Sequence, residues 1–156
     1  MISVESLLHA ARAKGLKIAS AESCTGGMVA AALTAVAGAS DVFERGFVTY
    51  SNAVKVEMLG VREATLLRHG AVSPEVAVEM AEGALDRSKA DLAVAITGIA
   101  GPGGSDHKPE GRVCFALAQR GRATQVETLD FGAQGRDRVR AAARDRALAL
   151  LAGALI

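Results

Sequence analysis

The hydrophobic positions of this chain follow two patterns in turn, helical spacing and short unbroken runs. Residues 3–15 carry apolar side chains at helical spacing between Ser3, which suits an N-cap, and Gly15, which can close the last turn. Residues 91–98 are apolar without alternation, the pattern of a strand covered on both faces. The same criteria predict helices over 26–38, 52–60, 62–70, 73–88 and 136–156, and strands over 16–21, 45–50, 112–121 and 122–132. The helix over 26–38 is apolar almost all round, so we expect it to be buried.

Strands that alternate with helices predict an α/β fold, a three-layer α/β/α sandwich. The last two strands are joined by a tight Arg-Gly turn, which indicates a hairpin and makes the sheet mixed, though mostly parallel. The length of 156 residues favours a single domain over 1–156. Ligands of such sheets bind beyond the carboxyl ends of the strands, where Ser23, residues 50–55 and the loop after Gly98 are expected to lie.

Composition narrows the class of protein. Half of the residues are hydrophobic, which excludes a disordered chain, and only 3% are aromatic, so the core must consist of Ala, Val, Leu and Ile. A net charge of +1 argues against direct binding of nucleic acid. Cys24 and Cys114 lie far apart without zinc-ligand spacing, so we expect no metal and a reduced, cytoplasmic protein. The N-terminus lacks a signal-peptide pattern, and no stretch is apolar enough to predict a membrane span.

The stretch "AESCTGG", residues 21–27, places Ser23 in a strand-to-helix turn. Backbone amides of Thr25, Gly26 and Gly27 would start the next helix, where partial positive charge favours an anion or a developing oxyanion. A serine in that position needs a base before it can act as a nucleophile. The alternative is that Ser23 or Thr25 only caps the helix.

The stretch "TYSNAVK", residues 49–55, contains Tyr50, the only tyrosine, followed by Asn52 and Lys55. A lysine at a helix start is unfavourably placed toward the helix dipole, which helps to lower its pKa. A lysine base needs a pKa lowered from about 10.4 toward 7 or 8. The alternative is a solvated lysine without a catalytic role.

Residues 98–111 form a glycine-rich loop whose amides, with Gly98, Gly101 and Gly103, could cradle a phosphate. The loop matches neither the P-loop nor the Rossmann pattern, and a plain surface loop is the alternative. In the last helix, Arg136 and Arg140 are four residues apart and share a face, which suits a phosphate or carboxylate. A solvated basic face is the alternative for these arginines.

Four stretches resemble, in order, the blocks of the CinA C-terminal domain family: "AESCTGG", "FERGFVTYSNAVKVEMLGV", "HGAVSPEVAVEMAEGAL" and "AVAITGIAGPGGSDHKPEG". The resemblance covers nearly the whole chain. Stand-alone members of the family are known as nicotinamide mononucleotide deamidases, and larger members carry an additional N-terminal domain. From the resemblance we expect this chain to be of the stand-alone form. The loop 98–111 is slightly short for the family, and Cys114 stands where an aromatic residue is more usual.

The resemblance implies an amidohydrolase of pyridine nucleotide salvage, which converts nicotinamide mononucleotide and water into nicotinic acid mononucleotide and ammonia. It implies a small-molecule nucleotide substrate, no metal or cofactor, and a homodimer. The family's serine nucleophile, lysine and nearby tyrosine map to Ser23, Lys55 and Tyr50, and its arginine near the C-terminal helix maps to Arg136 or, second, Arg140. Such Ser-Lys chemistry is a variant of the nucleophile-and-base scheme.

Two alternatives from other classes stay open at this point. One is a nucleotide-binding or regulatory module without turnover, against which the presence of Ser23 and Lys55 argues. The other is a DNA-linked role suggested by the competence association in the family name, against which the near-neutral charge argues. We also expect the side chain of Cys24 to point away from the site.

Overall fold

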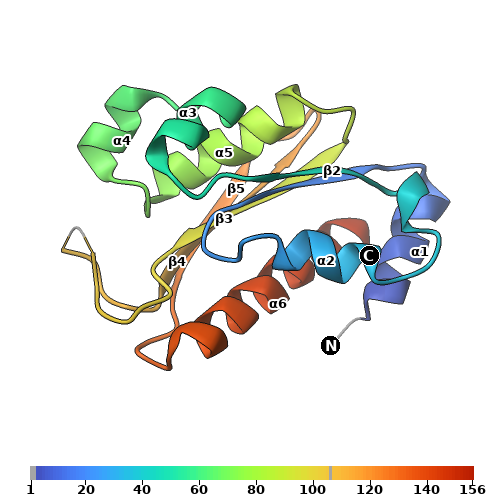
Figure 1. The fold of residues 1–156 in the computed structure, drawn as a ribbon. Coiled ribbons are helices and arrows are strands. Elements are labelled where there is room, and N and C mark those ends of the chain that lie inside the picture. Colours follow the sequence, from blue (N-terminus) through green and yellow to red (C-terminus); the bar gives the residue numbers. More distant parts are fainter. Residues whose placement is uncertain (1–2, 106) are drawn as a thin grey trace.

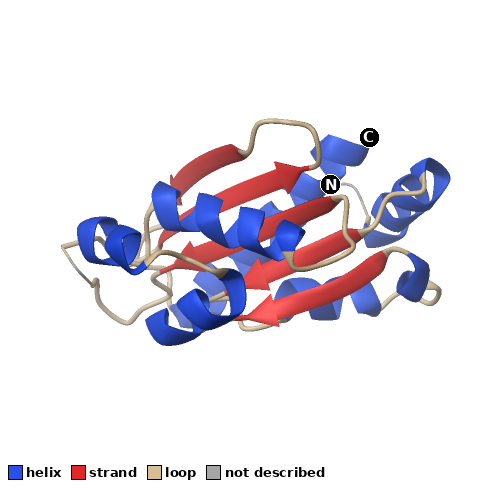
Figure 2. Ribbon diagram, turned by 90° about the horizontal axis from the view of Figure 1, so that it is seen from above, coloured by secondary structure: helices blue, strands red, loops and turns tan. Residues whose placement is uncertain are grey.

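The computed structural model describes residues 3–105 and 107–156, which form one five-stranded sheet between two layers of helices (Figures 1 and 2). The strands are β1 (Ile18–Glu22), β2 (Phe43–Val48), β3 (Leu92–Gly98), β4 (Arg112–Gln119) and β5 (Gln125–Asp130). The helices are α1 (Val4–Lys14), α2 (Met28–Thr34), α3 (Asn52–Leu59), α4 (Glu63–His69), α5 (Pro74–Asp86) and α6 (Arg136–Leu155), with a 3-10 turn η1 (Ala39–Asp41).

The strand order in the sheet is β2-β1-β3-β4-β5. Strand β1 pairs in parallel with β2 and β3, whereas β4 pairs antiparallel with both β3 and β5. Only β4 therefore runs against the other strands, and the α/β sandwich with a mixed, mostly parallel sheet is confirmed. The unbroken apolar run over 91–98 became β3, whose two neighbours and two helical layers bury it, as its pattern predicts.

The two faces of the sheet carry side chains of different size. Leu92, Val94 and Ile96 of β3 pack in the core beneath α1, α2 and α6, while Ala93 and Ala95 face the opposite layer of α3, α4 and α5. Strand β4 repeats the pattern, with Val113, Phe115 and Leu117 on the first face and Cys114, Ala116 and Ala118 on the second. Small side chains let α5 lie close to the sheet, which explains how a chain with few aromatic residues builds two closely packed cores.

The expectation of a long buried helix over 26–38 was wrong. Helix α2 ends at Thr34, and only Val29 and Leu33 of its residues are buried, while Ala31 is exposed. The reason is its place in the fold, since α2 packs over β2, an edge strand, and against α6 (Figure 1). One side of the helix therefore faces out, and the many alanines tolerate exposure because each exposes little apolar area.

Gly83 of α5 lies against the end of α3, and it supplies a test of this close packing. A Cβ built on Gly83 would overlap the carbonyl oxygen of Leu59, so α3 and α5 would have to separate. We predict that Gly83→Ala lowers the free energy of unfolding by about 2 kcal/mol or more. The matched control is Gly153→Ala in α6, where a new Cβ meets nothing within 4 Å.

The control variant should gain up to about 1 kcal/mol from the better helix propensity of alanine. Chemical denaturation of the original protein and of both variants, fitted with one common m-value, measures the two changes in the free energy of unfolding. A Gly83→Ala protein as stable as the Gly153→Ala protein would show that α5 does not pack as closely as described.

Candidate active site

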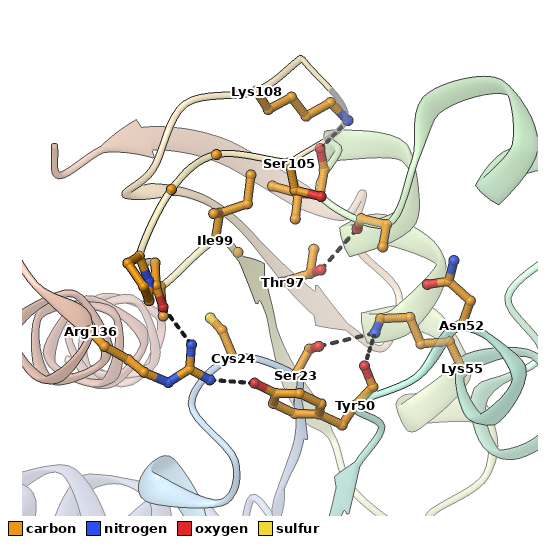
Figure 3. A pocket seen from close by; sticks show the side chains of 18 residues that line it. Ser23, Cys24, Tyr50, Asn52, Lys55, Thr97, Ile99, Ser105, Lys108 and Arg136 are labelled. Atoms are coloured by element: carbon orange, nitrogen blue, oxygen red, sulfur yellow. Dashed lines mark hydrogen bonds between the residues drawn. The ribbon is translucent and has the colours of Figure 1, made fainter. Parts of the chain in front are cut away.

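Three loops meet at the carboxyl ends of the parallel strands β1, β2 and β3. These strands end nearly level, because Glu22 of β1 lies opposite Val48 of β2 and Ile96 of β3. The loops that follow surround one pocket with a cavity volume of about 450 Å³ (Figure 3). Its lining consists of Ser23, Cys24, Tyr50, Asn52, Lys55, Ala71, Val72, residues 97–105, Lys108 and Arg136. The convergence expected from the strand order therefore holds.

Ser23 and Lys55 are in direct contact inside the pocket. The Nζ of Lys55 lies 3.0 Å from the Oγ of Ser23 (Figure 3). It also donates to the carbonyl oxygen of Thr49 at 2.8 Å. Lys55 comes from the first turn of α3, whose N-cap Ser51 accepts from the amide of Val54. Its side chain is only 1% exposed, so the alternative of a solvated lysine is wrong.

Burial is the main cause of a lowered pKa at Lys55. Removal from water disfavours the ammonium and lowers the pKa of Lys55 to about 8, while nearby Cys24 acts weakly in the opposite direction. The polar atoms that contact its Nζ belong to a hydroxyl and to backbone carbonyls, which are neutral groups. A substantial share of Lys55 is therefore unprotonated at mildly alkaline pH and able to take a proton from Ser23.

The turn that carries Ser23 is held by the residue before it, Glu22, which is fully buried. Its carboxylate accepts from the hydroxyl of Thr25 at 2.6 Å and from the amide of Gly27 at 3.2 Å. The amide of Gly26 donates to the carbonyl of Ser23 at 3.0 Å. Thr25, Gly26 and Gly27 do not line the pocket. The amide of Gly27 already donates to Glu22, and that of Gly26 donates to Ser23, so the sequence-based interpretation of these amides as the anion site does not fit the structure.

Cys24 lines the pocket, contrary to the expectation that its side chain points away from the site. Its sulfur is directed away from the hydroxyl of Ser23 in Figure 3. Burial raises the pKa of the Cys24 thiol to about 11, so the thiol stays protonated near neutral pH and is a poor nucleophile. Of the three adjacent groups in the turn, Ser23 contacts Lys55 inside the pocket, whereas the hydroxyl of Thr25 donates to Glu22 outside the pocket lining.

The two candidate arginines of α6 have different environments. Arg136 lines the pocket and donates to the carbonyl of Gly101 at 2.7 Å and to the hydroxyl of Tyr50 (Figure 3). Arg140 lies outside the lining and donates through Nε to the carbonyl of Cys24 at 3.0 Å. Arg136 therefore faces the pocket, whereas Arg140 supports the backbone next to Ser23.

The glycine loop forms the upper wall of the pocket, with Gly98, Gly101 and Gly103 in the lining. The amide of Gly103 is engaged by the carboxylate of Glu110. Lys108 closes the loop against the opposite wall, because its Nζ donates to the carbonyls of His69 and Val72. Asn52 also lines the pocket, with an exposed side chain.

Sequence analysis missed three residues of this site: Glu22, Thr97 and Lys108. Thr97 is buried in the pocket wall, where its hydroxyl donates to the carbonyl of Ala71 at 2.8 Å. The partners of Lys108, His69 and Val72, lie 39 and 36 residues away, a distance that no local pattern predicts. The partners of Glu22 lie three to eight residues further along the chain. An acidic residue directly before Ser23, followed by Thr25 and two glycines, was the available indication.

Within residues 3–105 and 107–156, no group of three or more His, Cys, Asp or Glu side chains is arranged to hold a metal ion. None of the helices in the same ranges combines the length and apolar character needed to cross a membrane.

Comparison with known proteins gives the family of this chain. Residues 3–155 match the CinA C-terminal domain. The chain belongs to the CinA C-terminal domain family. It is 52% identical over 148 residues, 94% of this chain and 89% of the relative, to the nicotinamide-nucleotide amidohydrolase PncC of Escherichia coli K12. The resemblance inferred from the four sequence blocks is thereby confirmed.

Other members of the CinA family are longer, and some have known structures. A CinA-like protein of Chlorobium phaeobacteroides is 54% identical over 138 residues, which are 86% of this chain but 33% of that relative. The crystal structure of the competence/damage inducible protein CihA from Agrobacterium tumefaciens superposes with a TM-score of 0.93 at 46% identity, covering 96% of this chain and 92% of that one.

The lowered pKa of Lys55 generates a prediction for the pH dependence of turnover. A base must be neutral, and with a pKa of about 8 only roughly a tenth of Lys55 is neutral at pH 7. We predict that kcat rises close to tenfold per pH unit below about pH 8 and levels off above it. Initial rates at saturating substrate from about pH 6 to about 9.5 measure this profile. A flat profile, or one that falls between pH 7 and 8, would contradict the assignment.

Proposed function

We propose that this protein is a nicotinamide-nucleotide amidohydrolase that converts nicotinamide mononucleotide and water into nicotinic acid mononucleotide and ammonia. The observation that carries the proposal is the buried contact of 3.0 Å between the Nζ of Lys55 and the Oγ of Ser23 inside a pocket of about 450 Å³. A nucleophile in contact with a base of lowered pKa is the arrangement that acyl transfer requires. The PncC relative carries this activity in its name, at 52% identity over most of both chains.

The first half of the reaction forms an ester on Ser23. Neutral Lys55 takes the proton of the Ser23 hydroxyl while the Oγ attacks the carboxamide carbon, whose oxygen becomes an oxyanion. The tetrahedral intermediate collapses as Lys55 returns the proton to the amide nitrogen. The C–N bond breaks and ammonia leaves, so the nicotinoyl group remains as an ester of the Ser23 Oγ.

The second half releases the acid. Lys55 takes a proton from a water molecule, and the water oxygen attacks the ester carbon. The C–O bond to Ser23 breaks, and the Oγ recovers the proton from Lys55. The net change is one amide and one water converted into one acid and one ammonia, with both catalytic residues restored and no metal or cofactor needed.

Proton transfer to the ammonia is assigned to Lys55 before Tyr50. The Nζ of Lys55 contacts the reacting Oγ, whereas the Tyr50 hydroxyl accepts a hydrogen bond from Arg136. In this proposal Tyr50 stays part of the catalytic site, because its ring and hydroxyl stand beside Ser23 at the pocket mouth (Figure 3).

The remaining pocket residues bind the ribose phosphate in this proposal. Arg136 is the cation that lies in the pocket wall with its guanidinium at the mouth, and it can exchange its bonds to Gly101 and Tyr50 for a phosphate. Asn52 and the glycine loop with Gly98 and Gly103 complete the wall. Salvage of pyridine nucleotides in the cytoplasm and assembly as a homodimer follow from the family resemblance and form part of the proposal.

The nucleophile is tested by two neighbouring substitutions. Ser23→Ala removes the attacking oxygen, so we predict that kcat for ammonia release from nicotinamide mononucleotide falls by roughly four or more powers of ten. Cys24→Ala is the matched control, because Cys24 lines the same pocket but its thiol stays protonated, and this variant should keep most of the activity. Circular dichroism of both proteins checks that the fold is intact.

Near-normal turnover by a folded Ser23→Ala protein would exclude the covalent mechanism. The substrate class is tested by a panel that contains nicotinamide, its riboside, its mononucleotide and the dinucleotide. Tight binding of the mononucleotide without ammonia release from any of these would instead support a regulatory module.

A further inference from the structure

The carboxylate of Glu22 accepts four hydrogen bonds, two from the nucleophile turn, residues 23–27, and two from the first turn of α2. Its Oε1 accepts from Thr25 at 2.6 Å, and the same oxygen accepts from the amide of Val29 at 3.0 Å. Its Oε2 accepts from the amide of Ala30 at 3.0 Å. Both oxygens act only as acceptors, as in an ionised carboxylate, and the side chain is 0% exposed.

This carboxylate closes the start of α2 to other anions. The amides at the start of a helix are the donors that bind a phosphate or an oxyanion, and Glu22 already accepts from those of Gly27, Val29 and Ala30. Neither the substrate phosphate nor the reaction oxyanion can therefore bind there without expelling a buried charge. The donor for the oxyanion has to lie elsewhere in the turn.

One amide of the turn meets the requirements for an oxyanion donor. Within residues 3–105 and 107–156, the amides of Cys24 and Thr25 donate to no backbone carbonyl. Cys24 lines the pocket, whereas Thr25 is fully buried outside the lining. The amide of Cys24 follows the nucleophile directly, which is the position that supplies an oxyanion donor in other serine hydrolases with a strand-to-helix turn.

The backbone on both sides of Cys24 is fixed. The amide of Ser23 donates to the carbonyl of Ile96 in β3 at 2.9 Å, and Arg140 donates to the carbonyl of Cys24 at 3.0 Å. The main-chain carbonyl of Glu22 also accepts from the amide of Thr49 at 2.9 Å, and Thr49 in turn accepts from Lys55. Glu22 is thus hydrogen-bonded both to the turn that carries Ser23 and to Thr49, which binds the Nζ of Lys55.

We propose that Glu22 is a positioning residue, which fixes the 23–27 turn so that the Ser23 hydroxyl faces Lys55 and the amide of Cys24 is left to bind the oxyanion. This inference rests on the proposed function for its substrate, but not for its geometry. Its consequence is a specific one: loss of the carboxylate should impair the transition state and leave binding of the ground-state substrate intact.

The test substitutes Glu22→Gln and uses Glu79→Gln as the matched control. Glu79 also caps a helix start, accepting from the amide of Arg62 at 2.8 Å and from the hydroxyl of Thr65 at 2.6 Å, but it lies in the α5 layer outside the pocket. In Glu22→Gln an amide nitrogen replaces an acceptor that faces backbone donors, which shifts the turn. We expect kcat to fall about 10- to 100-fold, because a small misplacement of reacting groups slows the chemical step by such a factor. KM should stay within about twofold of the original value. Glu79→Gln should leave both constants unchanged.

A second readout does not depend on nicotinamide mononucleotide. An alkyl fluorophosphonate reacts with an activated serine, so that the Oγ of Ser23 bonds to phosphorus, fluoride leaves, and the serine proton passes to Lys55. The phosphoryl oxygen of this adduct occupies the oxyanion position. We expect the labelling rate, followed by intact mass, to fall in Glu22→Gln by about the same 10- to 100-fold factor and to stay unchanged in Glu79→Gln.

The outcomes separate the two proposals. Labelling of Ser23 in the original protein without release of ammonia would refute the proposed substrate. The labelling rates of the variants would still test the positioning role of Glu22. A Glu22→Gln protein with kcat and labelling rate unchanged, or with a higher KM alone, would overturn the positioning role. If Glu22→Gln does not fold, Thr25→Val removes one of the four hydrogen bonds and should slow labelling several-fold, and an unchanged rate in that variant would overturn the proposal.

Discussion

The burial of Lys55 without a countercharge is the constraint on which this site depends. Lysine is almost never fully buried in proteins unless it is paired. Here its Nζ contacts a hydroxyl and backbone carbonyls, and the fall of its pKa to about 8 corresponds to about 3 kcal/mol of disfavoured charge. Favourable contacts in the rest of the fold offset this free-energy cost. Burial thereby leaves Lys55 as an amine that can act as a base near neutral pH. The same lysine in contact with solvent would remain protonated and could not activate Ser23.

The fold makes this burial possible through its parallel strands and its small side chains. Strands β1, β2 and β3 end at one edge, so Ser23, Lys55 and Gly98 meet although they are distant in the sequence. Alanines on one face of the sheet let α5 pack closely, and α3, which carries Lys55, rests on α5. The position of the base is thus a consequence of packing in a layer that contains few large residues.

Most of the fold follows from patterns that are local in the sequence. Ser3 caps the helix that it was expected to cap, and the unbroken run over 91–98 became the buried strand β3. The exposure of α2 could not be predicted in the same way, because a run of alanines has the same pattern at the centre and at the edge of a sheet. What decides its burial is the strand order, which depends on contacts between distant segments.

The site was predictable in its chemistry but not in its supporting contacts. Ser23, Lys55, Tyr50 and Arg136 were named from their residue types and the resemblance, and the structure brings all of them to one pocket. Arg140 shares a helix face with Arg136 but reaches the backbone of the nucleophile turn, since it lies one turn further along α6. The different partners of Arg136 and Arg140 depend on how the helices and the sheet pack together, and so do the hydrogen bonds of Lys108 to His69 and Val72. A local sequence pattern does not contain this information.

The central claim is that the nicotinoyl group passes through an ester on Ser23. Hydroxylamine tests it directly, because it competes with water for an acyl-enzyme and yields a hydroxamate of the mononucleotide. Products of the reaction with nicotinamide mononucleotide are separated and weighed by mass spectrometry at increasing hydroxylamine. We expect a hydroxamate whose share grows with hydroxylamine at the expense of the acid, and none with Ser23→Ala. Nicotinic acid mononucleotide as the sole product at every hydroxylamine concentration would contradict it.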